Sequence, residues 1–360
     1  MGLFGSSNET VDHPYWKTFA APPITVHWTV ATIVTILSTI SFLGNMLVIS
    51  IYRKFPNFNP NRRHYIVCLA ISDVVSPVTT NWMLVVNSFD GHWKFGSIGC
   101  QLYAFVQGYC GLTSITVIAA IALERSLNLS QEAEALLRSK RAWLVFVVCI
   151  YPLALSLPPL LGWSAYTTDG FMTTCCFEFI NRDWLSRSFL LYLMTFGFFV
   201  PVTAIVYSYG RIGRIIWKLK YQRLSTLNGH EVNEDSQPPT EVPQNRQPDF
   251  AALWTMFIVV VAFLVAWTPY AILALIGQFG PRQWLEPYSL TVASILAKSS
   301  TAYNPFIYAM TDSTFFTNFE QLIEESCLSV CLGTRRTENP TRTTRAEAGD
   351  QAQAIEMVPL

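Results

Sequence analysis

Residues 287–309 read PYSLTVASILAKSSTAYNPFIYA, a mostly apolar stretch with a single cation, Lys298, at its midpoint. A stretch of this length can cross a bilayer as a helix, which takes about 20 residues. About 11 residues lie on either side of Lys298, so at 1.5 Å per residue it sits roughly 16 Å from each end. A cation at this depth costs about 2.5–3.5 kcal/mol or more, so we interpret Lys298 as a functional residue. The structural alternative is a buried ion pair with Asp73, an acid in an earlier apolar stretch.

Six further apolar stretches precede this one, and together the seven stretches set the fold class. The chain of 360 residues is 51% hydrophobic and 13% charged, with a net charge of zero. Soluble proteins carry about 25% charged residues, so this composition argues against a water-soluble enzyme. It also gives no positive field that would attract nucleic acid. Because runs this long and continuous favour helices over barrel strands, we predict an all-α membrane protein, a bundle of seven transmembrane helices. The expected spans are 27–52, 65–87, 98–124, 142–162, 188–214, 251–275 and 287–309.

Basic residues are distributed unevenly between the two sides of the predicted bundle. Of the 24 Lys and Arg, 18 lie on the side of the C-terminal tail, five lie on the side of the N-terminus, and Lys298 lies within a span. Because cytoplasmic loops are enriched in Lys and Arg, we expect the N-terminus outside and the C-terminus in the cytoplasm. Residues 27–310 then form the transmembrane domain, and residues 1–26 form an extracellular segment with a glycosylation sequon at Asn8.

The segments on the expected cytoplasmic side are polar or amphipathic. The third loop, about 216–249, contains several prolines and is expected to be flexible. After the seventh span, residues 311–332 have apolar residues at helical spacing, which predicts a short amphipathic cytoplasmic helix. Its Cys327 and Cys331 are either palmitoylation sites or free thiols. Residues 333–360 are rich in Thr and Arg and are expected to be disordered.

Five of the seven spans contain one short motif each, in a fixed order. The motifs are Gly44-Asn45 in the first span, Leu69-Ala70-Ile71-Ser72-Asp73 in the second, Glu124-Arg125-Ser126 at the end of the third, Ala266-Trp267-Thr268-Pro269-Tyr270 in the sixth and Asn304-Pro305-Phe306-Ile307-Tyr308 in the seventh. This set resembles the rhodopsin-like G-protein-coupled receptors over about residues 30–325. Lys298, six residues before Asn304, stands where opsins have their retinal-binding lysine. The chain therefore resembles an opsin, in particular the invertebrate and non-visual bistable opsins.

The resemblance implies a light-activated receptor rather than an enzyme. Its cofactor would be retinal, 11-cis in the dark, held by a Schiff base on Lys298. The chemistry agrees, because an aldehyde condenses with a lysine amine and burial favours the neutral, nucleophilic amine. The implied partners are a heterotrimeric G protein, arrestin, a receptor kinase and membrane lipid, with no role for nucleic acid. The implied location is the plasma membrane or a photoreceptor membrane.

A retinal pocket needs apolar walls and one counterion for the protonated imine. By motif position, Trp267, Tyr270, Phe263 and Phe105 are the expected wall residues, and ordinary helix packing is the alternative. Tyr103 stands where vertebrate visual opsins have the counterion glutamate, and a phenol is neutral at pH 7.

The second outside loop supplies two acids that could take the place of this glutamate. Asp169 lies six residues before Cys175, where many invertebrate and non-visual opsins have a counterion glutamate. Glu178 is the second acid, and the alternative for either is a solvated loop acid. The resemblance favours Asp169 as the counterion, and we interpret Glu178 as the solvated acid.

The resemblance also implies a disulfide between Cys100 and Cys175, with Cys176 as the rival partner. At the cytoplasmic end, it implies a lock in which Glu124 and Asp249 hold Arg125. Asp73, Asn304, Pro305 and Tyr308 belong to the signalling motifs. Ser126 replaces the tyrosine usual in the family, and Asp312-Ser313-Thr314 departs from the triplets that opsins have after the seventh helix, so the sequence does not predict the G-protein class.

Two other functions share part of this pattern. A retinal photoisomerase resembling retinochrome would also use Lys298, but the intact Arg125 and Asn304–Tyr308 motifs favour signalling. A receptor for a diffusible ligand would leave Lys298 without a role. The sequence contains no cluster of residues with the spacing of a metal site.

Overall fold

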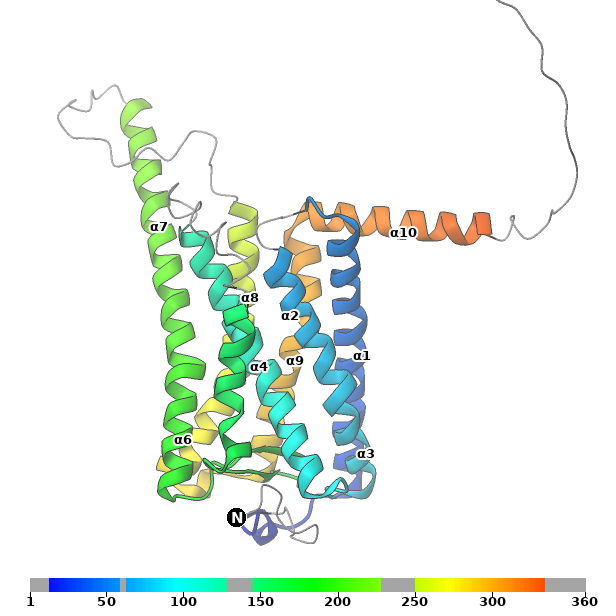
Figure 1. The fold of residues 1–360 in the computed structure, drawn as a ribbon, viewed down its shortest axis with the longest axis vertical. Helices are drawn as coiled ribbons and strands as arrows, with labels where there is room; N and C mark the ends of the chain where they lie inside the picture. Colours follow the sequence, from blue (N-terminus) through cyan, green and yellow to red (C-terminus); the bar gives the residue numbers. More distant parts are fainter. Residues whose placement is uncertain (1–12, 59–62, 128–143, 145, 228–249, 334–360) are drawn as a thin grey trace, which may run out of the picture. The chain divides into compact units, whose positions relative to one another are not determined.

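The chain folds into a bundle of long helices, described by a computed structural model over residues 13–58, 63–127, 144, 146–227 and 250–333 (Figure 1). The predicted spans appear in order, with α2 joined to α3 and α6 joined to α7 as single spans. The helices are α1 (Ile24–Lys54), α2 (Arg63–Ser76), α3 (Trp82–Asp90), α4 (Gly96–Leu127), the helix Phe146–Ser156, α6 (Trp184–Met194), α7 (Val200–Leu227), α8 (Phe250–Phe279), α9 (Pro287–Thr311) and α10 (Ser313–Gly333).

Five helical segments of the described residues are long and apolar enough to cross a membrane. They are Ile24–Lys54, Arg63–Asp90, Gly96–Leu127, Trp184–Lys218 and Trp254–Phe279. The helix Phe146–Ser156 is apolar but shorter. The 25-residue α9 lies outside this group because its apolar residues alternate with Ser, Thr, Asn and Lys298. Polar residues at this depth mark functional segments of membrane proteins.

Two spans contain a widened turn next to a proline. Pro77 begins the π-helical turn Pro77–Asn81 between α2 and α3, and the π-helical turn Thr195–Phe199 ends just before Pro201. Proline has no N–H group to donate and its ring crowds the preceding turn, so a wider turn accommodates it without ending the helix. Each span therefore continues across its proline.

A small β-hairpin crosses one end of the bundle. Strands β1 (Tyr166–Asp169) and β2 (Thr174–Phe177) pair antiparallel, with Asp169 opposite Thr174 and Thr167 opposite Cys176. Gly170 begins the turn with φ +46°. A Cβ at Gly170 would lie 3.0 Å from Thr291 Oγ1 and 3.2 Å from Pro287 O, so glycine lets the hairpin approach α9 closely.

The N-terminal segment covers this hairpin from the same end of the bundle (Figure 1). The backbone N–H of His13 donates to Thr168 Oγ1 at 3.3 Å. Trp16 is buried in an apolar cluster with Phe179 and Leu285. Together with the hairpin, the segment forms a lid over this end.

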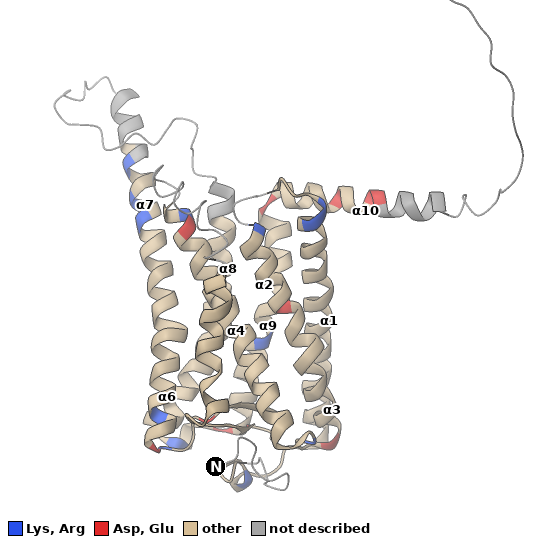
Figure 2. Cartoon of the chain, viewed as in Figure 1, with Lys and Arg blue, Asp and Glu red and all other residues tan. Residues whose placement is uncertain are grey.

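Charged residues gather at the two ends of the bundle, and its middle is almost uncharged (Figure 2). Lys298 and Asp73 are exceptions within the described helices. An apolar exterior with few internal charges is the pattern that a lipid environment selects. The all-α bundle predicted from the sequence is therefore the fold observed.

At the end of the bundle that carries α10, the observed helix bounds differ from the predicted ones. The predicted loop 216–249 begins inside α7, which continues to Leu227. Trp217 and Tyr221, four residues apart, stack with ring centroids 5.9 Å apart, and no glycine or proline follows Gly213 before Leu227. α10 lies where the amphipathic helix was predicted, and its backbone includes Cys327 and Cys331. Asn8, Asp249 and residues 334–360 lie outside the described residues.

Candidate functional site

Lys298 projects from α9 into a cavity beneath the hairpin. Its Nζ lies 5.8 Å from the centre of the Tyr103 ring. Asp73 has different partners, since its carboxylate accepts hydrogen bonds from Asn304 Nδ2 at 2.9 Å and Ser114 Oγ at 3.3 Å. The alternative of a Lys298–Asp73 ion pair is therefore not what the structure forms.

The cavity has a volume of about 150 Å³. A single water needs about 10–15 Å³, so the space suits a ligand of many heavy atoms. Lys298 and Asp169 are the charged groups among the described residues of its wall. The rest of the wall is largely apolar and includes Gly108, Gly111, Leu112, Ile115, Leu155, Phe189, Leu193, Met194, Phe198, Phe263, Trp267, Tyr270, Ala271 and Ala297.

The aromatic predictions for this wall are correct for three residues and wrong for one. Phe263, Trp267 and Tyr270 line the cavity. Phe105 instead stacks on Tyr109 with centroids 6.4 Å apart and packs beside Trp93. The rotation of α4 turns Phe105 away and presents the glycines and Leu112 to the cavity, which sequence spacing alone had not established.

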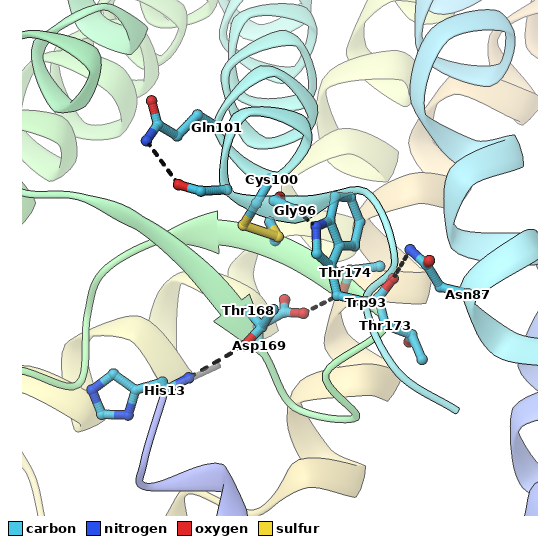
Figure 3. The surroundings of a disulfide bond; sticks show 12 residues. His13, Asn87, Trp93, Gly96, Cys100, Gln101, Thr168, Asp169, Thr173 and Thr174 are labelled. Atoms are coloured by element: carbon cyan, nitrogen blue, oxygen red, sulfur yellow. Dashed lines mark hydrogen bonds between the residues drawn. A yellow bond between two sulfur atoms is a disulfide. The ribbon is translucent and has the colours of Figure 1, made fainter. Parts of the chain in front are cut away.

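The hairpin is fastened to α4 by a disulfide between Cys100 and Cys175, whose Cα atoms lie 5.4 Å apart (Figure 3). Cys176, the rival partner, is a free thiol. The bond fixes the strand beside the first turns of α4 and above Lys298. Because the strand is fixed, the acids of the hairpin have defined positions.

Asp169 is the hairpin acid that faces the cavity. It is 5% exposed, and its carboxylate accepts a hydrogen bond from the Thr174 hydroxyl (Figure 3). Burial raises the pKa of this carboxyl, while the Thr174 hydrogen bond and the charge of Lys298 act in the opposite direction. The alternative that Asp169 is a solvated loop acid is therefore wrong.

Glu178 is also buried, at 2% exposure, so the expectation that it is a solvated loop acid is wrong. Its hydrogen bonds are made within the loop. Its carboxylate accepts hydrogen bonds from the backbone N–H groups of Ile180 at 2.6 Å and Asn181 at 3.0 Å. His13 Nε2 lies 3.4 Å from the same carboxylate. Glu178 is not part of the cavity wall, so the two loop acids have different environments.

Trp267 forms the inner end of the cavity and connects α8 to α9. Its ring stacks on Phe263 at 5.7 Å, and its Nε1 donates to Ser300 Oγ at 3.1 Å. A Cβ at Gly111 of α4 would lie 2.5 Å from the Trp267 ring. The indole is thus held by three helices, and a change in cavity contents would act on all of them.

Below Trp267, polar side chains join α1, α2, α4 and α9. Besides the Asp73 hydrogen bonds, Asn45 Nδ2 donates to Thr301 O at 2.8 Å, and a Cβ at Gly44 would lie 2.8 Å from Pro305. Glycine therefore allows α1 to approach the proline of α9. The predicted motif residues of these spans meet in one network.

The end of the bundle opposite the hairpin contains Arg125, the residue predicted to be held by Glu124 and Asp249. Glu124 is 5% exposed and Tyr308 4% exposed. Asp249, the third member of the predicted lock, lies outside the described residues.

The residues present fit the apolar aldehyde that the sequence implies. The cavity offers one amine, a buried acid nearby and apolar walls on the remaining sides. Tyr103, predicted as a cofactor-binding residue, is not among the residues that line the cavity. Its side chain is 1% exposed, and its hydroxyl has no hydrogen-bond partner among the described residues. Sequence reasoning missed Thr174, Cys176 and Gln107, which also belong to this wall, because no motif distinguishes them.

Comparison with known proteins gives the same family by three routes. The family model described as "7 transmembrane receptor (rhodopsin family)" matches residues 44–308. A rhodopsin of Mizuhopecten yessoensis, named as GQ-coupled, is 31% identical over 84% of this chain and 61% of its own length. The melanopsin of Felis catus is 33% identical over 86% of this chain and 63% of its own length.

The crystal structure of squid rhodopsin is similar to the whole bundle. It has a TM-score of 0.76 and 25% sequence identity, covering 91% of this chain and 93% of that one. This chain spans less than two thirds of the length of the rhodopsin of Mizuhopecten yessoensis and of the melanopsin of Felis catus.

Proposed function

Because the chain belongs to the rhodopsin family of seven-transmembrane receptors, we propose that it is a light-activated receptor that binds retinal at Lys298 and signals to a heterotrimeric G protein. The observation that supports this most directly is the cavity in which one amine, Lys298, and one acid, Asp169, share an otherwise apolar wall. The family assignment inferred from the motifs is confirmed, and the receptor class it implies is not an enzyme class.

When bound, retinal supplies absorption of light and a change of shape at one double bond, and 11-cis is the proposed dark form. Lys298 provides the amine for a covalent link, and its depth in α9 keeps competing nucleophiles and water away. Asp169 provides the compensating negative charge, since a buried cation requires a partner. Tyr103 provides a hydroxyl that can donate or accept a hydrogen bond but has no charge at neutral pH.

The path from the cavity to the far end begins at Trp267. Its contacts with Phe263, Gly111 and Ser300 join α8, α4 and α9. Displacement of the indole would break the Trp267–Ser300 hydrogen bond and release α8 from α9 at that level. α8 contains Pro269, where the missing hydrogen bond allows a helix to bend.

The signalling end is proposed to open when α8 moves. Glu124 and Asp249 are proposed to hold Arg125 in the resting state, with Asp73, Asn304, Pro305 and Tyr308 forming the network that rearranges. A bundle with two packed states can be shifted by a ligand that favours one of them. Arrestin and a receptor kinase are proposed as further partners of the same face.

We place the chain in the plasma membrane or a photoreceptor membrane, with the N-terminus and hairpin outside and α10 in the cytoplasm. The excess of Lys and Arg on the α10 side supports this orientation. An outside hairpin also agrees with its disulfide, because disulfides persist in oxidising environments. Asn8 is then a glycosylation site, and Cys327 and Cys331 are palmitoylation sites on the cytoplasmic side.

A light-dependent nucleotide-exchange assay tests the proposal. The purified protein with 11-cis-retinal should form a pigment and should catalyse exchange on a G protein in light only, and a Gq-type protein is the first to test because one relative is named as GQ-coupled. Lys298→Ala is the control and should give neither pigment nor exchange. Light-driven isomerisation without nucleotide exchange would instead identify a photoisomerase. Absence of a pigment in the wild type would refute retinal binding.

The resemblance to invertebrate and non-visual opsins supports a second proposal, that the pigment is bistable. Asp169 belongs to the disulfide-fixed hairpin rather than to a helix that moves, so its charge can stay beside Lys298 in both states. Illuminated pigment should then keep its chromophore and return to the dark spectrum under a second wavelength. Rapid release of retinal after illumination would contradict this.

A further inference from the structure

Two free thiols from different spans lie in contact with each other. Cys68 of α2 and Cys149 of the helix Phe146–Ser156 are 81 residues apart in the chain, and their Sγ atoms lie 4.0 Å apart. Both side chains are only partly buried. Neither residue belongs to the cavity around Lys298, so the pair is a separate place in the bundle with reactive side chains.

The helices that carry the two thiols are both hydrogen-bonded to α4. The Tyr109 hydroxyl donates to Cys149 O at 3.3 Å. Ser72 Oγ, one turn along α2 from Cys68, donates to Cys110 O at 3.2 Å. The two sulfur atoms meet because both helices are positioned against this same neighbour.

The pair belongs to an outer, apolar face of the bundle. Residues three apart on a helix lie on the same face, so Cys68 shares a face with Ile71, and Cys149 shares one with Phe146. Ile71 and Phe146 are large apolar side chains that are exposed. Exposed apolar side chains within a transmembrane span contact the hydrocarbon of the bilayer. A reagent dissolved in the lipid can therefore reach the two thiols.

We propose that Cys68 and Cys149 form an oxidisable dithiol, which lipid peroxyl radicals convert to a disulfide that joins α2 to the helix Phe146–Ser156. The surroundings decide the class of oxidant. A water-soluble peroxide reacts with the charged thiolate, and an isolated charge is costly in apolar surroundings. A peroxyl radical takes a neutral hydrogen atom instead, and it forms in the lipid that the pair faces.

The reaction consumes two peroxyl radicals for each disulfide. One thiol gives its hydrogen atom to a peroxyl radical, which becomes a hydroperoxide, and the sulfur keeps an unpaired electron. A second peroxyl radical takes the hydrogen atom of the other thiol, and the two sulfur radicals pair their electrons in an S–S bond. A disulfide bond is about 2.05 Å long, so the sulfur atoms approach by about 2 Å, which side-chain rotation supplies.

The position of the pair along the spans provides a way back to the dithiol. Cys68 is the sixth residue of α2, about 7.5 Å along the helix axis from Arg63. In the orientation proposed above this is the cytoplasmic side, where soluble thiols keep cysteines reduced. Two exchange steps with such thiols restore both cysteines and leave the soluble thiol as a disulfide.

The test uses the retinal-free full-length protein in vesicles of polyunsaturated phosphatidylcholine. A lipid-soluble azo initiator in air generates peroxyl radicals in the lipid, and parallel vesicles also contain the radical scavenger tocopherol. Free thiols are then blocked with a maleimide, and the peptides are mapped by mass spectrometry. We expect a Cys68–Cys149 cross-link with the loss of two free thiols per chain. A phosphine should reverse the cross-link, and tocopherol should suppress it.

Matched variants separate this pair from the other thiols. Cys68→Ser and Cys149→Ser should each abolish the cross-link, whereas Cys110→Ser, which removes a buried thiol of α4, should retain it. The wild-type peptide map identifies the bond directly, so the result does not depend on the folding of any variant.

Two results would overturn the inference. One is a wild-type protein that forms no Cys68–Cys149 cross-link under the initiator, and the other is a cross-link that tocopherol does not suppress. The assay contains neither retinal nor a G protein, so its outcome is independent of the test of the proposed function.

Discussion

Removal of the disulfide between Cys100 and Cys175 is expected to lower the free energy of unfolding by about 4–5 kcal/mol. The two cysteines are 75 residues apart in the chain. In the chain-entropy model, closing a loop of that length removes about 15 cal/mol/K from the unfolded state, which is about 4.5 kcal/mol at 25 °C. The folded state should also lose order at the hairpin, because that bond fixes β2 to α4.

Unfolding in detergent, followed by circular dichroism against denaturant, measures this loss. The variants are Cys100→Ala, Cys175→Ala and the double variant Cys100→Ala/Cys175→Ala. All three remove the same bond, so their losses should be equal within about 0.5 kcal/mol instead of additive. Cys175→Ala is also combined with Cys176→Ala, so that the neighbouring thiol cannot take over the pairing with Cys100. Cys176→Ala alone is the matched control and should lose less than about 1.5 kcal/mol.

Three results would refute this reasoning. A loss below about 1 kcal/mol in every variant would mean that the loop-closure argument does not hold for this chain. Additive losses in the double variant would place the energy in side-chain packing. A loss in Cys176→Ala as large as in Cys175→Ala would mean that the hairpin register is off by one residue, and Asp169 would then lose its position beside Lys298.

Three further predictions concern the cavity. Lys298→Ala should fold with unchanged helix content but retain no retinal after borohydride reduction, and covalent retinal in this variant would contradict the assignment. Asp169→Asn should move the pigment's absorption toward the near-ultraviolet at neutral pH, whereas Glu178→Gln should leave the spectrum unchanged, and the opposite pattern would assign the counterion to Glu178. Gly111→Ala would put a methyl group 2.5 Å from the Trp267 ring, so it should cost about 1–3 kcal/mol in denaturant unfolding. An equally stable Gly111→Ala with a normal pigment would show that the indole can move without penalty.

Much of the architecture could be predicted because hydropathy and length decide membrane spans. Backbone groups in hydrocarbon must be paired within a segment, so a long apolar run has one stable conformation. The unusual depth of Lys298 could also be predicted from its position in the sequence, because a cation at mid-membrane is costly whichever way the helix is rotated. The helix ends were less predictable. α7 continues through Trp217 and Tyr221 to Leu227, because helix propensity and local stacking extend a helix beyond the membrane and hydropathy does not record this.

Side-chain direction was predictable only in part. Trp267 and Tyr270 belong to a motif whose position is fixed relative to Pro269, and both line the cavity. Phe105 has no such reference, and helical residues one or two positions apart in sequence point in different directions. Its prediction failed because α4 presents Gly108, Gly111 and Leu112 to the cavity instead.

The sequence by itself determined the seven spans, the lysine within the last of them and two acids in one loop that could face it. The resemblance favoured Asp169 over Glu178, but only the tertiary structure showed which of them faces the cavity, because the two lie nine residues apart and both are buried. The disulfide and the pairing of Asp169 with Thr174 turn one acid toward Lys298, while the backbone of Ile180 and Asn181 engages the other. The physical reason is that a shift of one residue in a β-pair moves every side chain to the opposite face, and register depends on contacts between residues far apart in the chain.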